Sequence, residues 1–267
     1  MSSSNNFDFT GQMSVPPSTE IQKLVAKRSE YLDALLENRF RKTELEDELS
    51  APRSTVDRSI RELETAGLVQ RVDGEFMITK TGEFAYRRYT EYASWHQTLS
   101  EAQPILNTID YDIPTEVISN AEVYNSLEHF PDNPVVTPVE LISESPYFKG
   151  ITPIVMSTYI ERIPGLLDQG IEYTGITTPD VVESVRNSSA IDLDFPDDSD
   201  GSYRLLVTEI PFSFALWIIE PNQTKHVGIT AHNESGTVGA IISKHPTVVE
   251  WGEQIYEEYA ERAEGVI

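Results

Sequence analysis

The sequence has no cysteine and no long apolar run, and each absence excludes a class of protein. Without cysteine the chain forms no disulfide, thiolate nucleophile or thiolate metal site. The longest fully apolar run, Phe214 to Ile219, is far shorter than the roughly 20 residues that span a bilayer. Residues 1–19 lack a basic region followed by an apolar core, so we expect a flexible tail and not a signal peptide. These features predict a cytoplasmic protein without a membrane segment.

Basic residues are also scarce, and they are unevenly placed. The formal net charge is -24, and the chain has only seven lysines. Residues 1–100 hold 13 Lys and Arg against 16 Asp and Glu, whereas residues 101–267 hold 7 against 28. Such an acid excess resembles the proteins of salt-accumulating archaea, although an ordinary acidic cytoplasmic protein is the alternative. At molar salt the Debye length is about 3 Å, so an acidic protein is not repelled from DNA at a distance.

Signatures of catalysis and of metal binding are missing as well. The sequence has no GxSxG, GxxxxGK[ST] or GxGxxG motif. His226 and His232 would lie ~20 Å apart on an extended strand at ~3.3 Å per residue, too far to chelate one ion. Pro196 occupies the place of the first carboxylate in a calcium-loop frame, so we interpret the acidic run as a hydrated loop; it comprises Asp192, Asp194, Asp197, Asp198 and Asp200. We expect no enzyme activity, no cofactor and no metal.

What the sequence does contain is a continuous helix, turn, helix and hairpin pattern over residues 42–79. Thr43 and Glu46 have the spacing of a capping box at a helix start. Pro52 suits the first turn of a second helix, whose apolar positions recur at i, i+4 and i+7. Gly67 ends that helix, because glycine enters the left-handed region cheaply. The runs 68–72 and 75–79 are then two strands joined by Asp73-Gly74, which favours a type I′ hairpin.

This order predicts a winged helix-turn-helix, a module that usually binds duplex DNA. The second helix would enter the major groove, where Arg bonds guanine and Ser or Thr reaches phosphates or base edges. The predicted DNA-binding residues are Arg53, Ser54, Thr55, Arg58, Arg61, Arg71 and Gly74. One alternative is that Asp57 pairs with Arg53 and Arg61 and leaves a solvated surface helix. Another is that the winged helix binds a protein.

Helices are predicted on both sides of the motif. An apolar stripe between Ile21 and Leu36 predicts one amphipathic helix before it. A long helix over 81–103 follows the wing and carries aromatic residues all round, which indicates burial on more than one side and predicts a homodimer; packing within one chain is the alternative. The predicted organisation is a tail (1–19), a DNA-binding domain (20–80), a linking and dimerisation helix (81–103) and a C-terminal domain (104–267).

The C-terminal domain alternates strands and helices before it becomes a series of strands. A capping signal at Thr137 starts a helix, a strand runs over 148–155, and a helix from Ser157 to Gly170 is kinked at Pro164. A strand at 171–177 and a helix from Thr178 follow, then strands at 203–208, 213–219, 226–231 and 237–242 and a helix at 246–263. The fold class is an α+β winged helix-turn-helix followed by an α/β domain with a mixed sheet.

A small-molecule effector would bind beyond the carboxyl ends of the parallel strands. Thr152 and Pro153 end one such strand, and Thr177 and Thr178 end the next, so their hydroxyls are candidates for a polar metabolite. Phe214 and Trp217, with Phe212, would supply an apolar wall, although aromatic residues in such a strand are more often plain core.

The segments RSTVDRSIRELETAGLV, with its Asp-Gly wing, and VGAIISKHPTVVEWGEQIYEEYAERA carry a family resemblance. Residues 20–264 resemble haloarchaeal winged-helix transcriptional regulators in which the first domain precedes a methanogenesis-regulator-like middle domain. A more distant resemblance is to TrmB-like regulators, whose core is similar to half of a phospholipase D fold; the HxK pair of that chemistry is absent here. The resemblance implies a DNA-binding transcriptional regulator. Together with the aromatic helix it leads us to expect a homodimer whose C-terminal domain senses a small metabolite or holds the dimer. The alternative is a winged-helix interaction scaffold that does not bind DNA.

Overall fold

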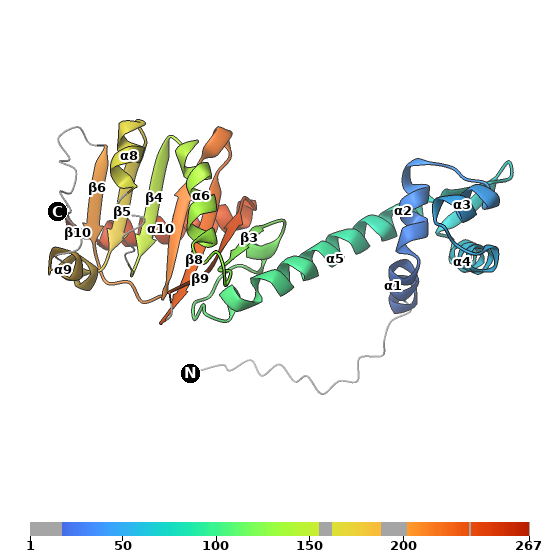
Figure 1. Cartoon of the computed structure of the whole chain (residues 1–267), viewed down its shortest axis with the longest axis horizontal. Helices are drawn as coiled ribbons and strands as arrows, with labels where there is room; N and C mark the ends of the chain where they lie inside the picture. The colour runs from blue at the N-terminus through green and yellow to red at the C-terminus, as the bar shows by residue number, and fades with distance from the viewer. Residues whose placement is uncertain (1–17, 155–161, 188–201, 235, 267) are drawn as a thin grey trace, which may run out of the picture. The chain divides into compact units, whose positions relative to one another are not determined.

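A computed structural model describes residues 18–154, 162–187, 202–234 and 236–266. The predicted tail, except for its last two residues, and the acidic run 192–200 lie outside these ranges. The chain divides into two compact units, residues 1–93 and 94–267 (Figure 1). The division falls inside a helix and not at the predicted boundary near residue 104.

The first unit is a winged helix. It contains α1 (Ser18–Lys27), α2 (Ser29–Glu37), α3 (Lys42–Glu48), α4 (Arg53–Thr65), β1 (Val69–Val72) and β2 (Glu75–Ile78). The single helix predicted before the motif is wrong, because Arg28 leaves helical geometry with φ -121° and ψ 22°. The Ser29 hydroxyl bonds the Ala26 carbonyl at this break. Val25, Leu32 and Leu35 are buried from the two helices together.

The start of α3 also differs from the prediction, whereas α4 and the wing agree with it. Glu44, and not Glu46, caps α3 by accepting the Arg41 backbone N–H at 2.6 Å. Pro52 precedes α4, and the positions i, i+4 and i+7 are buried in the domain core; they are Val56, Ile60 and Leu63. Gly67 follows α4 at φ 71°. Asp73 and Gly74 take φ 53° and 87°, as a type I′ turn requires, and join β1 to β2.

The long helix α5 (Lys80–Leu106) starts at the wing, includes Pro104 and ends three residues past the predicted end at residue 103. Tyr86 is buried in the core of the first unit, where its hydroxyl donates to Asp33 at 2.7 Å. Ala102 and Ile105 are fully buried in the core of the second unit. Each end of α5 is therefore an integral part of a different unit.

The second unit is built on one mixed eight-stranded sheet of order β10-β6-β5-β4-β7-β8-β9-β3. Its strands are β3 (Glu122–Asn125), β4 (Tyr147–Thr152), β5 (Glu172–Thr177), β6 (Tyr203–Val207), β7 (Phe214–Ile219), β8 (His226–Asn233), β9 (Gly236–Ser243) and β10 (Glu264–Val266). The neighbours β4, β5 and β6 are parallel, and all other pairings are antiparallel. The predicted mixed sheet is confirmed, and β3 and β10 are additional edge strands.

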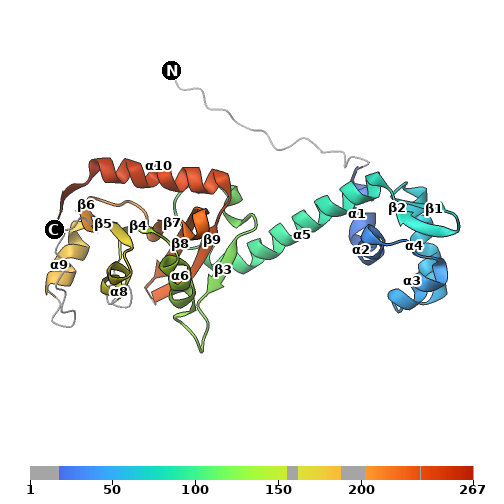
Figure 2. The same ribbon diagram turned by 90° about the horizontal axis from the view of Figure 1, so that it is seen from above.

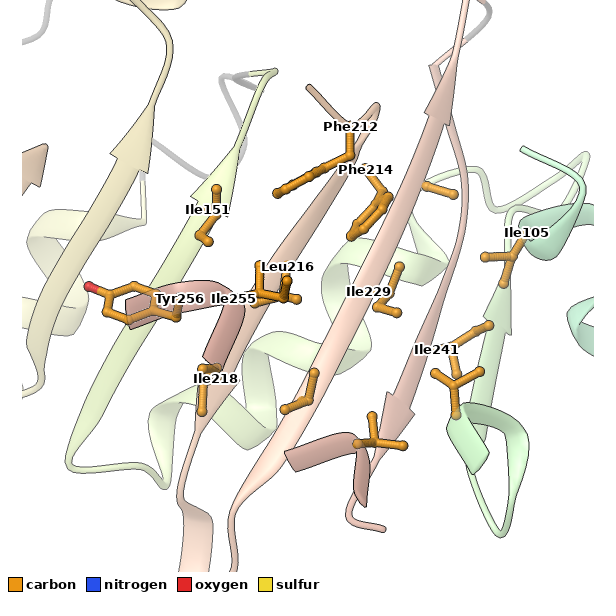
Figure 3. Close-up of a cluster of buried hydrophobic side chains, with 14 of the residues drawn as sticks. Ile105, Ile151, Phe212, Phe214, Leu216, Ile218, Ile229, Ile241, Ile255 and Tyr256 are labelled. Carbon is orange, nitrogen blue, oxygen red and sulfur yellow. The ribbon is translucent and has the colours of Figure 1, made fainter. Parts of the chain in front are cut away.

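Helices cover both faces of this sheet. In Figure 2, α10 (Pro246–Arg262) lies on one face, whereas α6 (Asn133–Ser143) and α8 (Ile163–Asp168) lie on the other. The helix α9 (Pro179–Asn187) connects β5 to β6, and the 3-10 turns η1 (Thr115–Ile118) and η3 (Pro221–Gln223) complete the unit. On the α10 face, the apolar side chains of α10 pack onto those of the central strands, as Figure 3 shows for Ile255, Leu216 and Ile229.

One predicted helix start and one predicted kink in this unit are wrong, and proline chemistry explains both. Thr137 does not cap a helix, because α6 begins at Asn133 with Pro134 in its first turn. Pro164 does not kink a helix but occupies the first turn of α8, where its missing N–H costs no hydrogen bond. The predicted start at Ser157 lies outside the described residues. Gly170 follows α8 at φ 81°, and Thr178 accepts the Val181 N–H at the start of α9, as predicted.

Candidate nucleic-acid interface

The exposed face of α4 gathers polar side chains opposite the core. At about 100° per residue, Ser54, Arg58 and Arg61 lie within roughly 60° of one another around the helix. All three are exposed, and the buried positions of α4 occupy the other side. Arg53 and Thr55 are exposed at the N-terminal end of the same helix, on either side of this group. The predicted base-reading residues therefore form one continuous polar surface.

Glu62 is the electrostatic centre of this helix. Its carboxylate accepts from Arg58 Nε at 2.9 Å, one turn earlier, and from Arg28 at 2.9 and 3.0 Å. Lys27 approaches it at 3.4 Å. The hydrogen bond from Arg58, followed by that from Arg28, lowers the pKa of Glu62 to about 2. Glu62 therefore joins α4 to the end of α1 and holds the guanidinium of Arg58 against the helix.

Asp57 has a different partner from the one that the surface-helix alternative requires. It pairs with Lys42 of α3, and not with Arg53 or Arg61. Within the part of the chain that the structure describes, neither of these two arginines makes an ion pair. A small cavity of about 170 Å³ lies between α4, Lys42 and Phe76, and Arg61 is among its lining residues. The arginines that carry no carboxylate partner are thus available to an external anion.

The wing carries one of the predicted DNA-binding arginines, Arg71. Arg71 of β1 is exposed, and its guanidinium lies 5.5 Å from the ring centroid of its cross-strand partner Phe76. Gly74 is exposed at the hairpin tip. Stacking on Phe76 restricts the guanidinium, so Arg71 is held at the wing without a carboxylate within the described residues.

The predicted effector threonines lie side by side at the strand ends, where they bond to backbone groups. Thr152 and Thr177 are cross-strand partners at the ends of β4 and β5, and Pro153 and Thr178 follow them. The Thr177 hydroxyl donates to the Thr152 carbonyl at 2.9 Å, and the Thr152 hydroxyl donates to the carbonyl of Ile154. Both hydroxyl protons are therefore engaged by backbone groups. The structure places these residues at one edge of the sheet, and an effector site there stays a prediction.

The predicted aromatic wall does not form. Phe214 belongs to the core on the α10 face, next to Phe212, whereas Trp217 belongs to the core on the α6 face. Successive side chains of a strand alternate between faces, so residues 214 and 217 of β7 point to opposite sides. Trp217 donates its Nε1 proton to the Thr230 hydroxyl at 3.1 Å. These aromatic residues are core, which was the alternative weighed for them.

His226 and His232 both lie on β8 and have separate partners. His226 Nδ1 is 2.8 Å from the Thr224 carbonyl, and His232 Nδ1 is 3.4 Å from the Thr237 hydroxyl. In the described ranges, no three His, Asp or Glu side chains are grouped so as to hold a metal ion. The same ranges contain no helix with the length and apolarity needed to cross a membrane.

Two family models match most of the chain. Residues 18–99 match the HVO_A0261 N-terminal domain, and residues 131–262 match the middle domain of the methanogenesis regulatory protein FilR1. The second match begins just before α6 and ends with α10, so it covers nearly the whole sheet. A search of curated proteins found no match.

Solved structures show only distant likeness. TrmBL2, an archaeal chromatin protein described as having a novel mode of DNA binding, is 14% identical over 92% of this chain and 98% of that chain, with a TM-score of 0.40. A polyphosphate kinase from Porphyromonas gingivalis is 11% identical over 68% of this chain and 26% of that chain, with a TM-score of 0.38. The mitomycin 7-O-methyltransferase MmcR is 14% identical over 63% and 57%, with a TM-score of 0.25. TM-scores this low carry no argument about function.

Proposed function

Because the chain joins an HVO_A0261-type N-terminal domain to a methanogenesis-regulator-type middle domain, we propose that it is a sequence-specific, DNA-binding transcriptional regulator. In this proposal α4 enters the major groove and the wing contacts the flanking backbone. The observation that carries it is the exposed surface of Ser54, Arg58 and Arg61 on a helix whose other side is core. The protein acts in the cytoplasm, and it has no catalytic role.

The ion pairs assign different tasks to the arginines. Arg61 and Arg53 have no carboxylate partner within the described residues, so they bind DNA without first breaking an ion pair. The Arg58 Nε–H already donates to Glu62, so Arg58 must break this bond or bind DNA through its remaining N–H groups. Arg53 and Arg61 are therefore the first candidates for base reading, since an arginine fork matches guanine O6 and N7. Arg71 contributes charge at the wing, and its effect is the same for all sequences.

The experiment begins with selection of duplexes from a random pool by the full-length protein in potassium chloride, followed by fluorescence anisotropy on the selected site. Arg61→Ala should cost ~1 to 3 kcal/mol, roughly 5- to 150-fold in Kd, and relax the sequence preference at one position. Arg71→Ala should weaken selected and random duplexes by the same factor. Circular dichroism checks that each variant keeps its fold.

A matched control separates helix α4 from general electrostatics. Arg58→Ala/Arg61→Ala and Arg87→Ala/Arg88→Ala each remove two exposed arginines from the first unit, but Arg87 and Arg88 lie on α5. For the selected site, the Kd of the α4 double variant should exceed that of the α5 double variant by more than tenfold. Equal losses, or full binding by the α4 double variant, would contradict the proposal and favour a protein-binding winged helix.

A homodimer is part of the proposal, because a palindromic site needs two motifs about one DNA turn, ~34 Å, apart. The aromatic residues of α5 differ in their exposure, and Tyr89 and Trp95 are half-buried. Tyr86 is buried within the chain, whereas Phe84 and Tyr92 are 64% and 62% exposed. The two positions are eight apart, which turns them by about 80° around the helix, so both side chains lie within one quarter of its circumference. We place the contact with a second copy on this side of α5.

A further inference from the structure

Three polar side chains form a row across the parallel strands of the second unit. Lys149 of β4 pairs in register with Thr174 of β5, which pairs with Arg204 of β6. Two residues further along these strands, Ile151, Ile176 and Leu206 lie in the core that α10 covers. Side chains two residues apart share a face of the sheet, so the row lies on the α10 face.

Tyr256 of α10 joins this row from the helix side. The Lys149 ammonium lies 5.3 Å from the centroid of the Tyr256 ring and 5.5 Å from that of Tyr147. The Tyr256 hydroxyl shares a hydrogen bond with Thr174, and Arg204 is close enough to act on it electrostatically. Figure 3 shows this hydroxyl pointing away from the apolar side chains of the cluster. Burial raises the pKa of Tyr256 to about 12, so it keeps its proton and remains a donor.

The two cations of the row are unusual in so acidic a domain. Residues 101–267 contain four times as many Asp and Glu as Lys and Arg. Lys225 and Arg262 of this unit pair with Glu253 and Glu258, but within the described residues no carboxylate pairs with Lys149 or Arg204. Glu172, two residues before Thr174 on the same face, makes no ion pair with either of them there. Both cations are exposed, and their strands are separated by only one strand, ~10 Å. Such a pair favours a bound anion.

We propose that Lys149, Thr174, Arg204 and Tyr256 form a binding site for a small metabolite that carries a phosphate or a dicarboxylate group. The guanidinium offers a two-pronged donor and the ammonium a point charge. Because Thr174 and Tyr256 share one hydrogen bond, one of their two hydroxyl protons remains as an uncharged donor for the ligand. The site lies on the face opposite to Thr177, and near the amino ends of the parallel strands instead of their carboxyl ends. As the effector site of a regulator it rests on the proposed function, whereas anion binding as such does not.

Calorimetric titration of the full-length protein at constant ionic strength tests the site, with inorganic phosphate and malonate as probes. The wild type should bind at least one probe saturably, with one site per chain. Lys149→Gln and Arg204→Gln should each weaken binding more than tenfold. Arg186→Gln and Lys244→Gln remove the same charge from exposed positions elsewhere in the unit and should change it less than twofold. Tighter binding of phosphate assigns a phosphoryl ligand, and tighter binding of malonate a dicarboxylate.

The result that would overturn the site is the absence of saturable binding by the wild type, or an equal loss in the control variants. Thermal melts establish that the variants are folded. A second measurement, of operator affinity with and without the bound probe, tests the link to regulation. By linkage the probe should change the DNA Kd by roughly 5- to 150-fold in the wild type and not in Arg204→Gln. Anion binding without any DNA binding would refute the proposed function alone, and DNA binding without anion binding would refute the site alone.

Discussion

The contact between Gly228 and Trp217 gives a sharp test of how the eight-stranded sheet is packed. The two residues are cross-strand partners on β8 and β7, and the indole lies directly over the glycine. A Cβ added to Gly228 would come within 2.0 Å of two indole atoms. Ordinary contact is 3.4–4 Å, so Gly228→Ala would have to displace the ring by more than 1 Å.

The ring has little room to move, which sets the size of the effect. Trp217 is only 5% exposed, and its Nε1 proton is donated to the buried Thr230 hydroxyl. Overpacking costs ~1 to 3 kcal/mol, and a strained or broken buried hydrogen bond adds about 1 kcal/mol. We expect Gly228→Ala to destabilise the unit by about 3 kcal/mol. At ~2 to 4 °C per kcal/mol for a unit of this size, the melting temperature falls by roughly 6 to 12 °C.

A double-mutant cycle shows whether the ring is the cause. Trp217→Leu alone should cost ~2 to 4 kcal/mol, because it opens a cavity and leaves the Thr230 hydroxyl unpaired. In that background Gly228→Ala should cost less than about 1 kcal/mol, a coupling of about 2 kcal/mol. Urea unfolding followed by circular dichroism measures each variant. Gly165→Ala in α8 is the control, since a Cβ there meets nothing within 4 Å. Additive costs for the two substitutions would refute the packing argument.

Two further predictions follow from buried and exposed groups. Burial lowers the pKa of His232 below its ordinary 6.5, so the imidazole is protonated less readily in the folded state than in the unfolded state. The free energy of unfolding is therefore unaffected by this group above about pH 6.5, and it falls as the pH drops below that value. Melts between pH 7.5 and 5 should therefore show a smaller loss of stability for His232→Gln than for the wild type. Equal loss in the two proteins would contradict this cause. Light scattering in high salt should give twice the 30.1 kDa chain mass for the wild type and the chain mass for Phe84→Ser/Tyr92→Ser. A monomeric wild type at micromolar concentration would contradict the proposed dimer contact on α5.

Local signals predicted the first unit well, because its boundaries depend on a few residues with narrow conformational choices. Pro52, Gly67 and the Asp73-Gly74 pair act within one or two residues of themselves, so α4 and the wing were predicted closely. The helix starts at Thr43 and Thr137 were predicted wrongly. At the first, Glu44 accepts the Arg41 N–H, and at the second, the helix begins at Asn133 with Pro134 in its first turn. The edge strands β3 and β10 have three or four residues each and exist through pairing with β9 and β6, which no local pattern reveals.

The sequence by itself determined the winged helix, the mixed sheet and the polar face of α4, because helical and strand periodicity state which side chains share a face. Only the tertiary structure decided which charges meet. Glu62 of α4 pairs with Arg58 of the same helix and with Arg28 between α1 and α2. Asp57 of α4 pairs with Lys42 of α3 instead of with an arginine of its own helix. Strand order likewise placed Lys149 and Arg204, 55 residues apart in the chain, on either side of Thr174. Pairings between distant segments depend on register and packing, and these are properties of the folded chain as a whole.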